Sequence, residues 1–291
     1  MKSKTKSSFR DHAAELWSSV PGNVLREDMG VRPEYIGTVM YDPPLVGFGA
    51  ADDPLFEVFK QPEVIGPWHK SPREWLPEAQ TVISFFFPMS EAVRASNRAA
   101  KQGASGLWAC ARVEGQAYIS AYIQAVAAWF QTQGDAACVP SADPRWQLLD
   151  AGKGITGYPE IRETTFGCSW SERHAAYVCG LGTFGLSKGL ITAKGMAGRF
   201  GSVLVSAAFA PDARSYTGVD DSCTRCGACV GRCPAQAIDP VRGKDHMKCW
   251  RFVTASRETL APRYGCGLCQ TGVPCEAQNP AAANGCIRDG K

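Results

Sequence analysis

The sequence lacks the features that mark membrane, secreted and nucleic-acid-binding proteins. No run of about eighteen or more apolar residues occurs in its 291 residues, so no membrane-spanning helix is expected. The basic N-terminus runs into Asp11 and Glu15 rather than into an apolar stretch, which predicts neither a secretory signal nor a twin-arginine leader. The net charge is only +3, so a nucleic-acid partner is not expected.

The composition, 45% apolar and 20% charged, is that of an ordinary soluble protein. The length favours one large domain with a smaller one, and residues 211–219 have the Pro, Gly and Ser content of a linker. We therefore predict domains over 1–215 and 216–291. The thirteen cysteines cluster at metal-binding spacings, which indicates a reducing cytoplasm rather than a disulfide-stabilised secreted protein.

The cysteines near the C-terminus carry the strongest signal. Residues 223–234 follow the spacing C-x2-C-x2-C-x3-C-P, with which bacterial ferredoxins hold 4Fe–4S clusters. In that motif three cysteines bind one cluster and the fourth belongs to a second cluster. We predict one cluster on Cys223, Cys226, Cys229 and Cys275, and another on Cys233, Cys249, Cys266 and Cys269. Structural zinc is the alternative, because C-x2-C pairs also suit tetrahedral zinc, although zinc does not require the C-x3-C-P ending.

The small positive charge lies on this cysteine-rich part, which has ten Lys and Arg against seven Asp and Glu from residue 216 onward. Arg225, Arg232, Lys248 and Arg251 could offset anionic clusters or attract an acidic redox partner. Charges scattered over a solvated face are the other interpretation. The remaining Cys110, Cys138 and Cys286 are interpreted as structural.

Hydrophobic periodicity predicts a mixed α/β (α+β) chain. Helices are expected over 9–19 and 114–133, strands over 36–41, 81–88, 136–140 and 202–209, and a helical turn near 146–149. A further helix is expected to end in the glycine-rich segment Cys179–Ser187. Its G-x-G-x-x-G pattern follows a helix and precedes a strand, the reverse of the order in a dinucleotide-binding unit, which argues against a Rossmann site.

Taken together, these motifs resemble epoxyqueuosine reductases and their relatives, the reductive dehalogenases. The resemblance covers residues 80–275 and rests on Glu172-Arg173, the glycine segment, Gly201-Ser202 and both cysteine blocks, all in matching order. It implies a nitroreductase-like domain that holds base-off cobalamin, followed by a ferredoxin-like domain with two 4Fe–4S clusters. The residues that would border cobalamin are Glu172, Arg173, Cys179, Gly180, Leu181, Gly182, Thr183, Phe184, Gly185, Ser187, Gly201 and Ser202.

The sequence also departs from this family. The segment Thr165–Trp170 has no carboxylate where epoxyqueuosine reductases carry a proton-donating aspartate. Five residues separate Cys269 from Cys275 where a C-x3-C-P ending is usual, and the C-terminal helical repeats that assist tRNA binding in many of those enzymes are not expected. The resemblance therefore implies a short, divergent member that keeps the cofactors and acts on a different, small substrate.

The proton donor is open among several groups. Tyr158, Tyr177 and Cys168 are the catalytic candidates, although buried tyrosines and cysteines are commonly structural. Cys168 and Cys179 could also be redox-active or nucleophilic thiols. His174 could ligate cobalt, but a histidine in a helix is more often only hydrogen-bonded.

Three functions remain open from the sequence. The first is a cobalamin-dependent reductase that receives electrons from a low-potential ferredoxin or flavodoxin. The second is an iron–sulfur electron-transfer protein that reduces a partner corrinoid protein or another enzyme. The third is epoxyqueuosine reduction with a changed proton donor.

Overall fold

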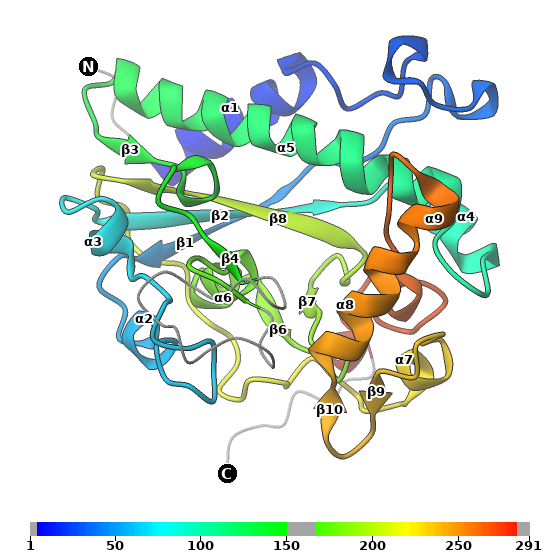
Figure 1. Cartoon of the computed structure of the whole chain (residues 1–291). Helices are drawn as coiled ribbons and strands as arrows, with labels where there is room; N and C mark the ends of the chain where they lie inside the picture. Colours follow the sequence, from blue (N-terminus) through cyan, green and yellow to red (C-terminus); the bar gives the residue numbers. More distant parts are fainter. Residues whose placement is uncertain (1–4, 150–166, 284–291) are drawn as a thin grey trace.

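The computed structural model describes residues 5–149 and 167–283, and at its centre is a four-stranded antiparallel sheet (Figure 1). The strands lie in the order β1 (Leu45–Ala50), β2 (Thr81–Pro88), β8 (Gly198–Val205) and β3 (Ala137–Cys138). Strand β2 pairs with β8 along its whole length, from Thr81 opposite Val205 to Pro88 opposite Gly198. A sheet with only antiparallel neighbours differs from the parallel sheet of dinucleotide-binding domains, as the order of elements around the glycine segment predicted.

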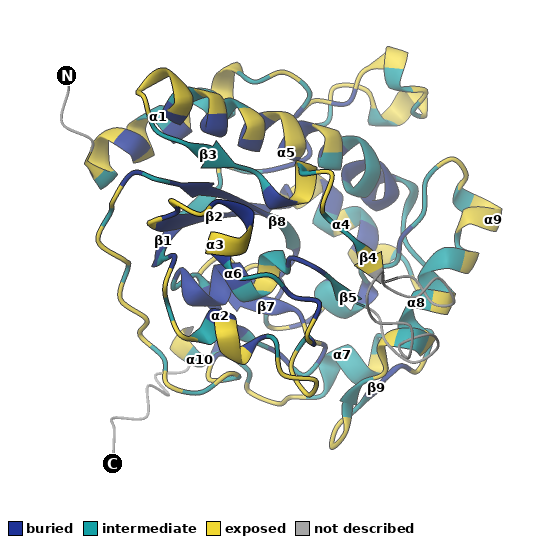
Figure 2. Cartoon of the chain, turned by 60° about the vertical axis from the view of Figure 1, so that its left-hand side comes forward, coloured by how far each residue is buried: buried dark blue, intermediate teal, exposed yellow. Residues whose placement is uncertain are grey.

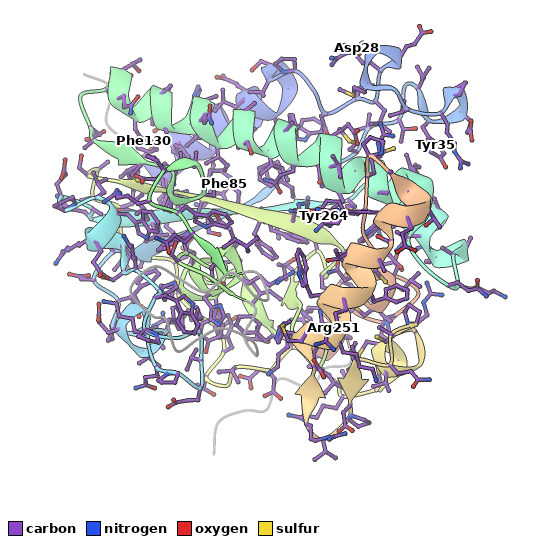
Figure 3. The ribbon with its side chains drawn as sticks, in the orientation of Figure 1. Asp28, Tyr35, Phe85, Phe130, Arg251 and Tyr264 are labelled. Carbon is purple, nitrogen blue, oxygen red and sulfur yellow. The ribbon has the colours of Figure 1, made fainter. Side chains whose placement is uncertain are left out.

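One face of the sheet is covered by two helices, α5 (Gly106–Thr132) and α1 (Lys6–Ser19) (Figure 1). Helix α5 begins at a Ser105 cap, whose hydroxyl accepts a hydrogen bond from the backbone N–H of Trp108 at 3.1 Å. Phe85 of β2 and Phe130 of α5 both lie in the apolar layer between sheet and helix (Figure 3), where each contacts the ring of Phe9. Burial of this layer supplies most of the driving force for folding here.

The other face of the sheet is covered by the short helix α6 (Glu172–Val178), and the strands between the two layers are buried (Figure 2). Trp170, which precedes the helix, is 1% exposed and stacks on Phe56, with ring centroids 5.8 Å apart. Its indole N–H donates to the hydroxyl of Ser202 in β8 at 2.9 Å. This bond fixes the start of α6 over the middle of the sheet.

The remaining elements of the large domain are short. They are η1 (Glu27–Met29), η2 (Pro33–Tyr35), α2 (Leu55–Val58), α3 (Pro72–Trp75), α4 (Glu91–Ala99), η3 (Pro140–Ala142), β4 (Leu148–Leu149), β5 (Gly167–Cys168), β6 (Gly182–Phe184) and β7 (Leu190–Thr192). Strand β4 pairs with β5, and β6 pairs with β7 in a hairpin. None of the helices among the described residues is long and apolar enough to cross a membrane.

The structure confirms the strand predicted over 81–88 and corrects other expectations. Residues 36–41 form only isolated bridges, because Gly37 has φ +85° and this left-handed residue interrupts an extended strand. The helical turn expected near 146–149 is instead the strand β4, whose partner lies eighteen residues later. Helix α5 begins eight residues before the predicted 114, and β8 begins at 198 rather than 202.

The cysteine-rich part follows the sheet domain and consists of short elements joined by tight turns (Figure 1). They are α7 (Ala228–Gly231), β9 (Ile238–Asp239), β10 (Gly243–Lys244), α8 (His246–Ala255), α9 (Arg257–Leu260), η4 (Leu268–Gln270) and α10 (Pro280–Ala283). Strands β9 and β10 form a two-stranded hairpin, and α7 packs against η4.

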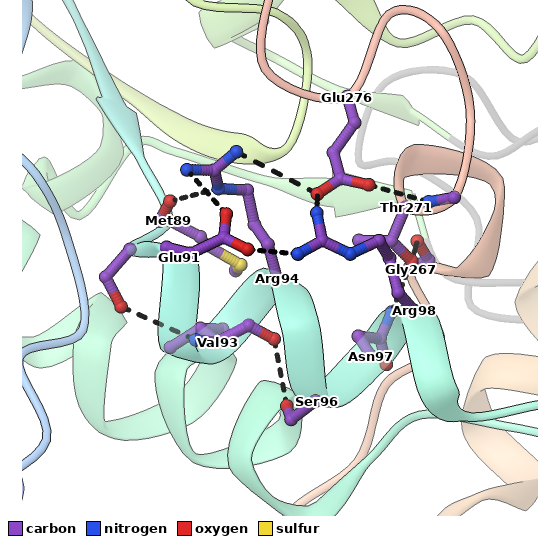
Figure 4. A network of polar contacts seen from close by, with 12 residues as sticks. Met89, Glu91, Val93, Arg94, Ser96, Asn97, Arg98, Gly267, Thr271 and Glu276 are labelled. Atoms are coloured by element: carbon purple, nitrogen blue, oxygen red, sulfur yellow. Dashed lines mark hydrogen bonds and ion pairs between the residues drawn. The ribbon is translucent and has the colours of Figure 1, made fainter.

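Helix α4 joins the two parts through a polar network (Figure 4). Arg98 donates to the Glu276 carboxylate at 2.6 Å, and the backbone N–H of Gly272 donates to the same carboxylate at 2.7 Å. The amide of Asn97 donates to Thr271 at 3.0 Å, and the guanidinium of Arg232 donates to the carbonyl of Asn97 at 3.1 Å. These contacts hold the cysteine-rich part in one place against the sheet domain.

The expected linker is also held in place. Asp212 accepts hydrogen bonds from Arg10 in α1, at 3.1 Å, and from the backbone N–H of Phe48 in β1, also at 3.1 Å. A segment that looks like a flexible connector in the sequence therefore runs along the edge of the sheet.

Candidate functional site

The first predicted cysteine quartet surrounds a hollow in the cysteine-rich part. Cys223, Cys226, Cys229 and Cys275 all line it, together with Met196 and part of the glycine segment. Among the residues that the structure describes, no three His, Cys, Asp or Glu side chains converge as closely as a single metal ion would need. The four thiols instead face a common space, an arrangement suited to a multi-atom cluster.

The second predicted quartet also comes together. Burial, with smaller contributions from the charges of Cys269, Cys249 and Cys233, raises the pKa of Cys266 to about 12. The charges of Cys249 and Cys233 likewise raise the pKa of Cys269. Mutual electrostatic effects of this kind require the four thiols to be neighbours. The grouping is the one that the spacing predicted, and the assignment as cluster ligands stays a prediction.

The two quartets are adjacent. Burial raises the pKa of Cys229 to about 11, and the next largest influence is Cys269 of the other quartet. Cys226 of the first quartet is exposed, and the other seven cysteines are half-buried. Because the exposed thiol belongs to the first quartet, we call that group the outer quartet and the second group the inner quartet.

The glycine segment connects the sheet domain to the first quartet. Gly182 has φ +157°, and a Cβ there would come within 2.0 Å of the Ile191 carbonyl oxygen, so the β6–β7 hairpin itself requires glycine at this position. Thr183 is buried and its hydroxyl accepts a hydrogen bond from the backbone N–H of Ser222 at 2.8 Å. Gly185, Leu186 and Ser187 line the hollow of the first quartet.

The other residues of this segment pack within the sheet domain. Leu181 lies beneath Gly47, where a Cβ would approach its Cγ to 2.9 Å, and Gly180 has φ +77° beside the carbonyl of Ala213. The ring of Phe184 packs against those of His174 and Tyr177. The structure thus places this segment beside the hollow of the first quartet, and its contact with cobalamin stays a prediction.

Glu172, the first residue of α6, has a buried carboxyl group. Both carboxyl oxygens of Glu172 are buried and have no hydrogen-bond partner among the described residues. Burial raises the pKa of Glu172 to about 7, against smaller lowering influences from Ser202, Trp170 and Ser141. Glu172 therefore holds or releases a proton near neutral pH.

Arg173, the next residue, lies near the second quartet. Its side chain is exposed, while the surrounding protein lowers its pKa. The next influences on its pKa are Cys269, Cys168 and Cys249, and we call the region between Arg173 and these cysteines the interior space.

Further cationic groups face the start of β8. The ring of Tyr264 lies against Arg112 and Arg257, whose guanidinium carbons are 3.8 and 4.1 Å from its centroid. Figure 3 shows Tyr264 near the start of β8. The charges of Arg112, Arg173 and Tyr264 affect the pKa of Arg199 in β8, which burial lowers. The sequence analysis missed Arg112 and Arg199, although Arg199 stands just before the quoted Gly201-Ser202.

The two residues of that Gly201-Ser202 pair point to opposite faces of the sheet. A Cβ on Gly201 would come within 2.9 Å of Ile123 of α5, so Gly201 faces the α5 layer. Ser202 faces α6, where it accepts the Trp170 hydrogen bond. Only Ser202 is on the same side as Glu172.

Of the two candidate reactive thiols, Cys179 is buried and Cys168 is half-buried, and both donate hydrogen bonds. The Cys168 thiol donates to the Trp170 carbonyl at 2.7 Å, and burial raises its pKa to about 12. Burial likewise raises the pKa of Cys179, whose thiol donates to the Val82 carbonyl at 3.3 Å. A reactive thiol needs a lowered pKa, so these environments favour structural roles for both cysteines.

The tyrosine and histidine candidates are also set apart from Glu172. Tyr177 lies five residues further along α6, about 140° around the helix, and its ring packs on Tyr216 with centroids 5.0 Å apart. His174 shares a 2.7 Å hydrogen bond with Ser171, and burial lowers its pKa to about 3. Tyr158 and Cys286 lie outside the described residues.

The cysteines expected to be structural have matching environments where the structure describes them. Cys110 is 2% exposed in the layer between α5 and the sheet. Cys138 is half-buried, and burial raises the pKa of its thiol to about 11.

Comparison with known proteins supports the cluster prediction and the fold. A family model described as a 4Fe–4S binding domain matches residues 217–239. None of the curated protein sequences matches the chain. An epoxyqueuosine reductase solved with an epoxyqueuosine-modified tRNA stem loop superimposes with a TM-score of 0.52 and 14% identity, covering 95% of this chain and 70% of that chain.

Two reductive dehalogenase structures superimpose on this chain with similar TM-scores and identities. One, whose structure suggests a mechanism for B12-dependent dehalogenation, has a TM-score of 0.54 and 14% identity, covering 88% of this chain and 33% of that chain. The catabolic reductive dehalogenase NpRdhA, in complex with 3-bromo-4-hydroxybenzoic acid, has a TM-score of 0.51 and 14% identity, covering 95% and 37%. Over most of its length, this chain therefore has the mixed α/β fold of epoxyqueuosine reductases and reductive dehalogenases, with a 4Fe–4S binding segment in its C-terminal part.

Proposed function

We propose that the protein is a cobalamin-dependent iron–sulfur reductase. In this proposal two 4Fe–4S clusters pass electrons inward to a base-off corrinoid held by the nitroreductase-like sheet domain, and a small substrate is reduced there. The observation that carries the proposal is the position of Arg173. It lines the interior space, and it lies near enough to Cys269 and Cys249 for their charges to affect its pKa. In this proposal the inner quartet faces the space that would hold the cofactor.

The residues around this space fit a bound polar group. Within residues 5–149 and 167–283, neither buried oxygen of Glu172 has a hydrogen-bond partner, and Arg173 is exposed. Buried polar atoms without partners are rare in proteins, so a ligand that contacts them is favoured. Glu172, Arg173 and neighbouring backbone would hold the edge of the corrinoid. The corrinoid would supply low-potential cobalt chemistry, while the protein would orient the reactants, exclude water and donate protons.

Glu172 is the proton source in this proposal. Its pKa of about 7 keeps a substantial fraction of the carboxyl group protonated at neutral pH, which suits a general acid. Cys168 lies near enough for the Glu172 charge to raise its pKa, so Glu172 lies close to the segment where epoxyqueuosine reductases carry their aspartate. The proton would leave a Glu172 carboxyl oxygen for the substrate, and solvent would replace it.

Electrons would enter at the outer quartet. Cys226 is exposed, and the neighbouring surface carries Val219, 63% exposed, and Val241, 91% exposed, beside Lys188 and Arg242. Apolar tips surrounded by cationic side chains suit transient docking of an acidic protein. A low-potential ferredoxin or flavodoxin is therefore the proposed donor.

The alternative function is an electron-transfer protein without a substrate of its own. The outward position of the first quartet favours it equally, because it would serve any redox partner. Titration of the anaerobic, iron-loaded protein with cobalamin separates the two functions. A reductase shifts the cobalamin absorbance to the base-off spectrum at micromolar concentration, whereas a carrier leaves the base-on spectrum unchanged.

A matched pair of variants sharpens this titration. Arg173→Ala should weaken cobalamin binding, because its side chain lines the interior space. Arg145→Ala should not, because Arg145 is on the surface in an ion pair with Asp143 at 2.7 Å. Equal cobalamin affinity of both variants would reject the proposed place of the cofactor.

A further inference from the structure

The segment that links β7 to β8 lies directly against the last cysteine of the outer quartet. The backbone N–H of Met196 donates to the carbonyl of Cys275 at 2.9 Å, and that of Ala197 donates to the carbonyl of Glu276 at 3.1 Å. Gly195 has φ +76°, and a Cβ there would overlap the backbone of Glu276. The sheet domain therefore holds the backbone of Cys275 in place.

The side chain of Met196 extends this contact to the sulfur atom. Its Sδ lies 3.2 Å from the Sγ of Cys275. Met196 is 3% exposed, and it lines the same hollow as the four cysteines of the outer quartet. A Cβ on Gly189 would overlap the Met196 methyl group, so the glycine at 189 leaves room for the thioether. Met196 thus belongs to the buried wall of this hollow.

Much of the hollow around Met196 is apolar. Aliphatic side chains and prolines line it together with the thioether, namely Leu186, Ile191, Val273, Pro274 and Pro280. A thioether has no hydrogen to donate, so Met196 offers no hydrogen bond to the sulfur of a cysteine that has lost its proton to bind iron. The inner quartet differs here, because Cys233 accepts a hydrogen bond from the backbone N–H of Ala237 at 3.3 Å.

This difference bears on the reduction potential of a cluster in the hollow. One-electron reduction adds a negative charge to an anionic cluster, and hydrogen bonds to its sulfurs or contact with water stabilise that charge. An apolar wall supplies neither and therefore lowers the potential. We propose that Met196 is a positioning residue of the outer iron–sulfur site, which holds Cys275 through its backbone and keeps the potential of the outer cluster low through its side chain.

The inference depends on the predicted 4Fe–4S cluster of the outer quartet and does not depend on cobalamin. It applies to the proposed reductase and to the electron-transfer alternative, because both take in electrons at the outer quartet. A donor of lower potential reduces its acceptor more completely. A low potential at the point of entry therefore favours transfer to a group that is difficult to reduce.

The test is a redox titration of the anaerobic, iron-loaded full chain, followed by electron paramagnetic resonance. The signal that disappears in Cys223→Ser identifies the outer cluster. Met196→Gln has a side chain of similar length and brings an amide N–H to the sulfur of Cys275. We expect its reduction equilibrium to shift about tenfold or more toward the reduced cluster, which is a rise of about 59 mV or more for one electron.

Two further variants separate polarity from disturbed packing. Met196→Leu keeps the wall apolar and should shift the equilibrium less than about twofold. Met29→Gln is the matched control, because Met29 is half-buried and packs against the core under α5. Should Met196→Gln not retain the outer iron, Met196→Ala admits water to the same wall and should shift the potential in the same direction.

Iron content and circular dichroism show whether each variant is folded and loaded. The inference is overturned if the outer potential is the same in the wild type and in the polar or shortened variant. It is also overturned if Met196→Leu shifts the potential as far as Met196→Gln, or if the outer quartet holds zinc. A shifted potential in a protein that takes up no cobalamin would reject the proposed reductase and keep this role of Met196. An unchanged potential in a protein that binds cobalamin would do the reverse.

Discussion

Arg173 of α6 and Cys269 of the inner quartet each influence the pKa of the other. The two residues are 96 positions apart and belong to different parts of the chain. Their proximity places the inner quartet beside the interior space. If the inner quartet holds a cluster, as proposed, an electron on that cluster would need no further relay to reach a ligand in that space.

This order of sites predicts different effects for the two quartets. Cys269→Ser should leave about four irons per chain instead of about eight, since each cluster holds four. The remaining outer cluster should still accept electrons from dithionite but should not pass them to cobalamin. Cys223→Ser should remove the outer cluster and slow reduction by a protein donor. Iron analysis and stopped-flow absorbance measure both effects.

The matched control is Cys110→Ser, since Cys110 is buried in the layer under α5 and away from both quartets. That variant should keep about eight irons. Retention of both clusters in Cys269→Ser would contradict the ligand assignment.

Glu172 should make stability depend on pH. Its pKa is about 7 in the folded protein and near 4.5 for an ordinary glutamate, so the folded state binds the proton more tightly. The stabilising effect is fully present below about pH 4.5 and is lost as pH rises through about 7. Over this window the wild type should lose up to about 3 kcal/mol relative to Glu172→Gln, whose amide does not ionise.

Urea unfolding of both proteins between pH 5 and 8, with iron retained, measures this difference. Glu258→Gln serves as a control, because Glu258 lies on the exposed side of α9. Parallel pH profiles of the wild type and Glu172→Gln would show that the carboxyl group is ionised in the folded protein across this range.

Glu276 should be important for attachment of the cysteine-rich part (Figure 4). Its side chain is 7% exposed and accepts from Arg98 and from the backbone N–H of Gly272. Glu276→Ala should leave these donors unpaired and lower the free energy of unfolding by about 2 to 4 kcal/mol. Because Glu276 follows Cys275, the outer cluster should also become more labile to chelators.

Glu91→Ala is the comparison for this network. Glu91 pairs with Arg94 and Arg98 but is 63% exposed, so its loss should cost under about 1 kcal/mol. Thermal unfolding and the rate of iron release give both quantities. A larger effect of Glu91→Ala than of Glu276→Ala would contradict the importance of burial here.

The proposed entry surface predicts a salt-dependent reaction with an acidic electron donor. Arg242→Glu beside the outer quartet should lower the second-order rate of reduction by ferredoxin several-fold, and the difference should shrink at high salt. Arg26→Glu, at the η1 turn of the sheet domain, changes the same charge elsewhere. Equal rates for these two variants would place donor docking on another surface.

Local sequence patterns predicted the parts of this fold that local chemistry determines. The apolar run 81–88 is a strand because every residue in it is buried between two layers. The cysteine spacing predicted which cysteines lie together, because ligand geometry constrains short loops strongly, and their role as cluster ligands stays a prediction. Residues 146–149 were mispredicted because their strand partner, Gly167–Cys168, is distant in sequence.

The site was less predictable for a similar reason. Arg112, Arg199 and Tyr264 are separated by 152 positions between first and last, and no spacing links them. The contact of the glycine segment with a cofactor was predicted from resemblance alone, whereas its position beside the first quartet depends on the β6–β7 hairpin. Glu172 was noted as part of a motif, but only the packing of α6 on the sheet shows that its carboxyl group is buried.

The central claim is that the inner iron–sulfur site delivers electrons to a corrinoid in the interior space. The most direct measurement is the ultraviolet–visible spectrum of protein purified anaerobically from cobalamin-replete cells, with iron and cobalt counted per chain. We predict about eight irons and about one cobalt, with a base-off corrinoid spectrum beneath the cluster absorbance. About eight irons without cobalt, and no uptake of added cobalamin, would contradict the claim.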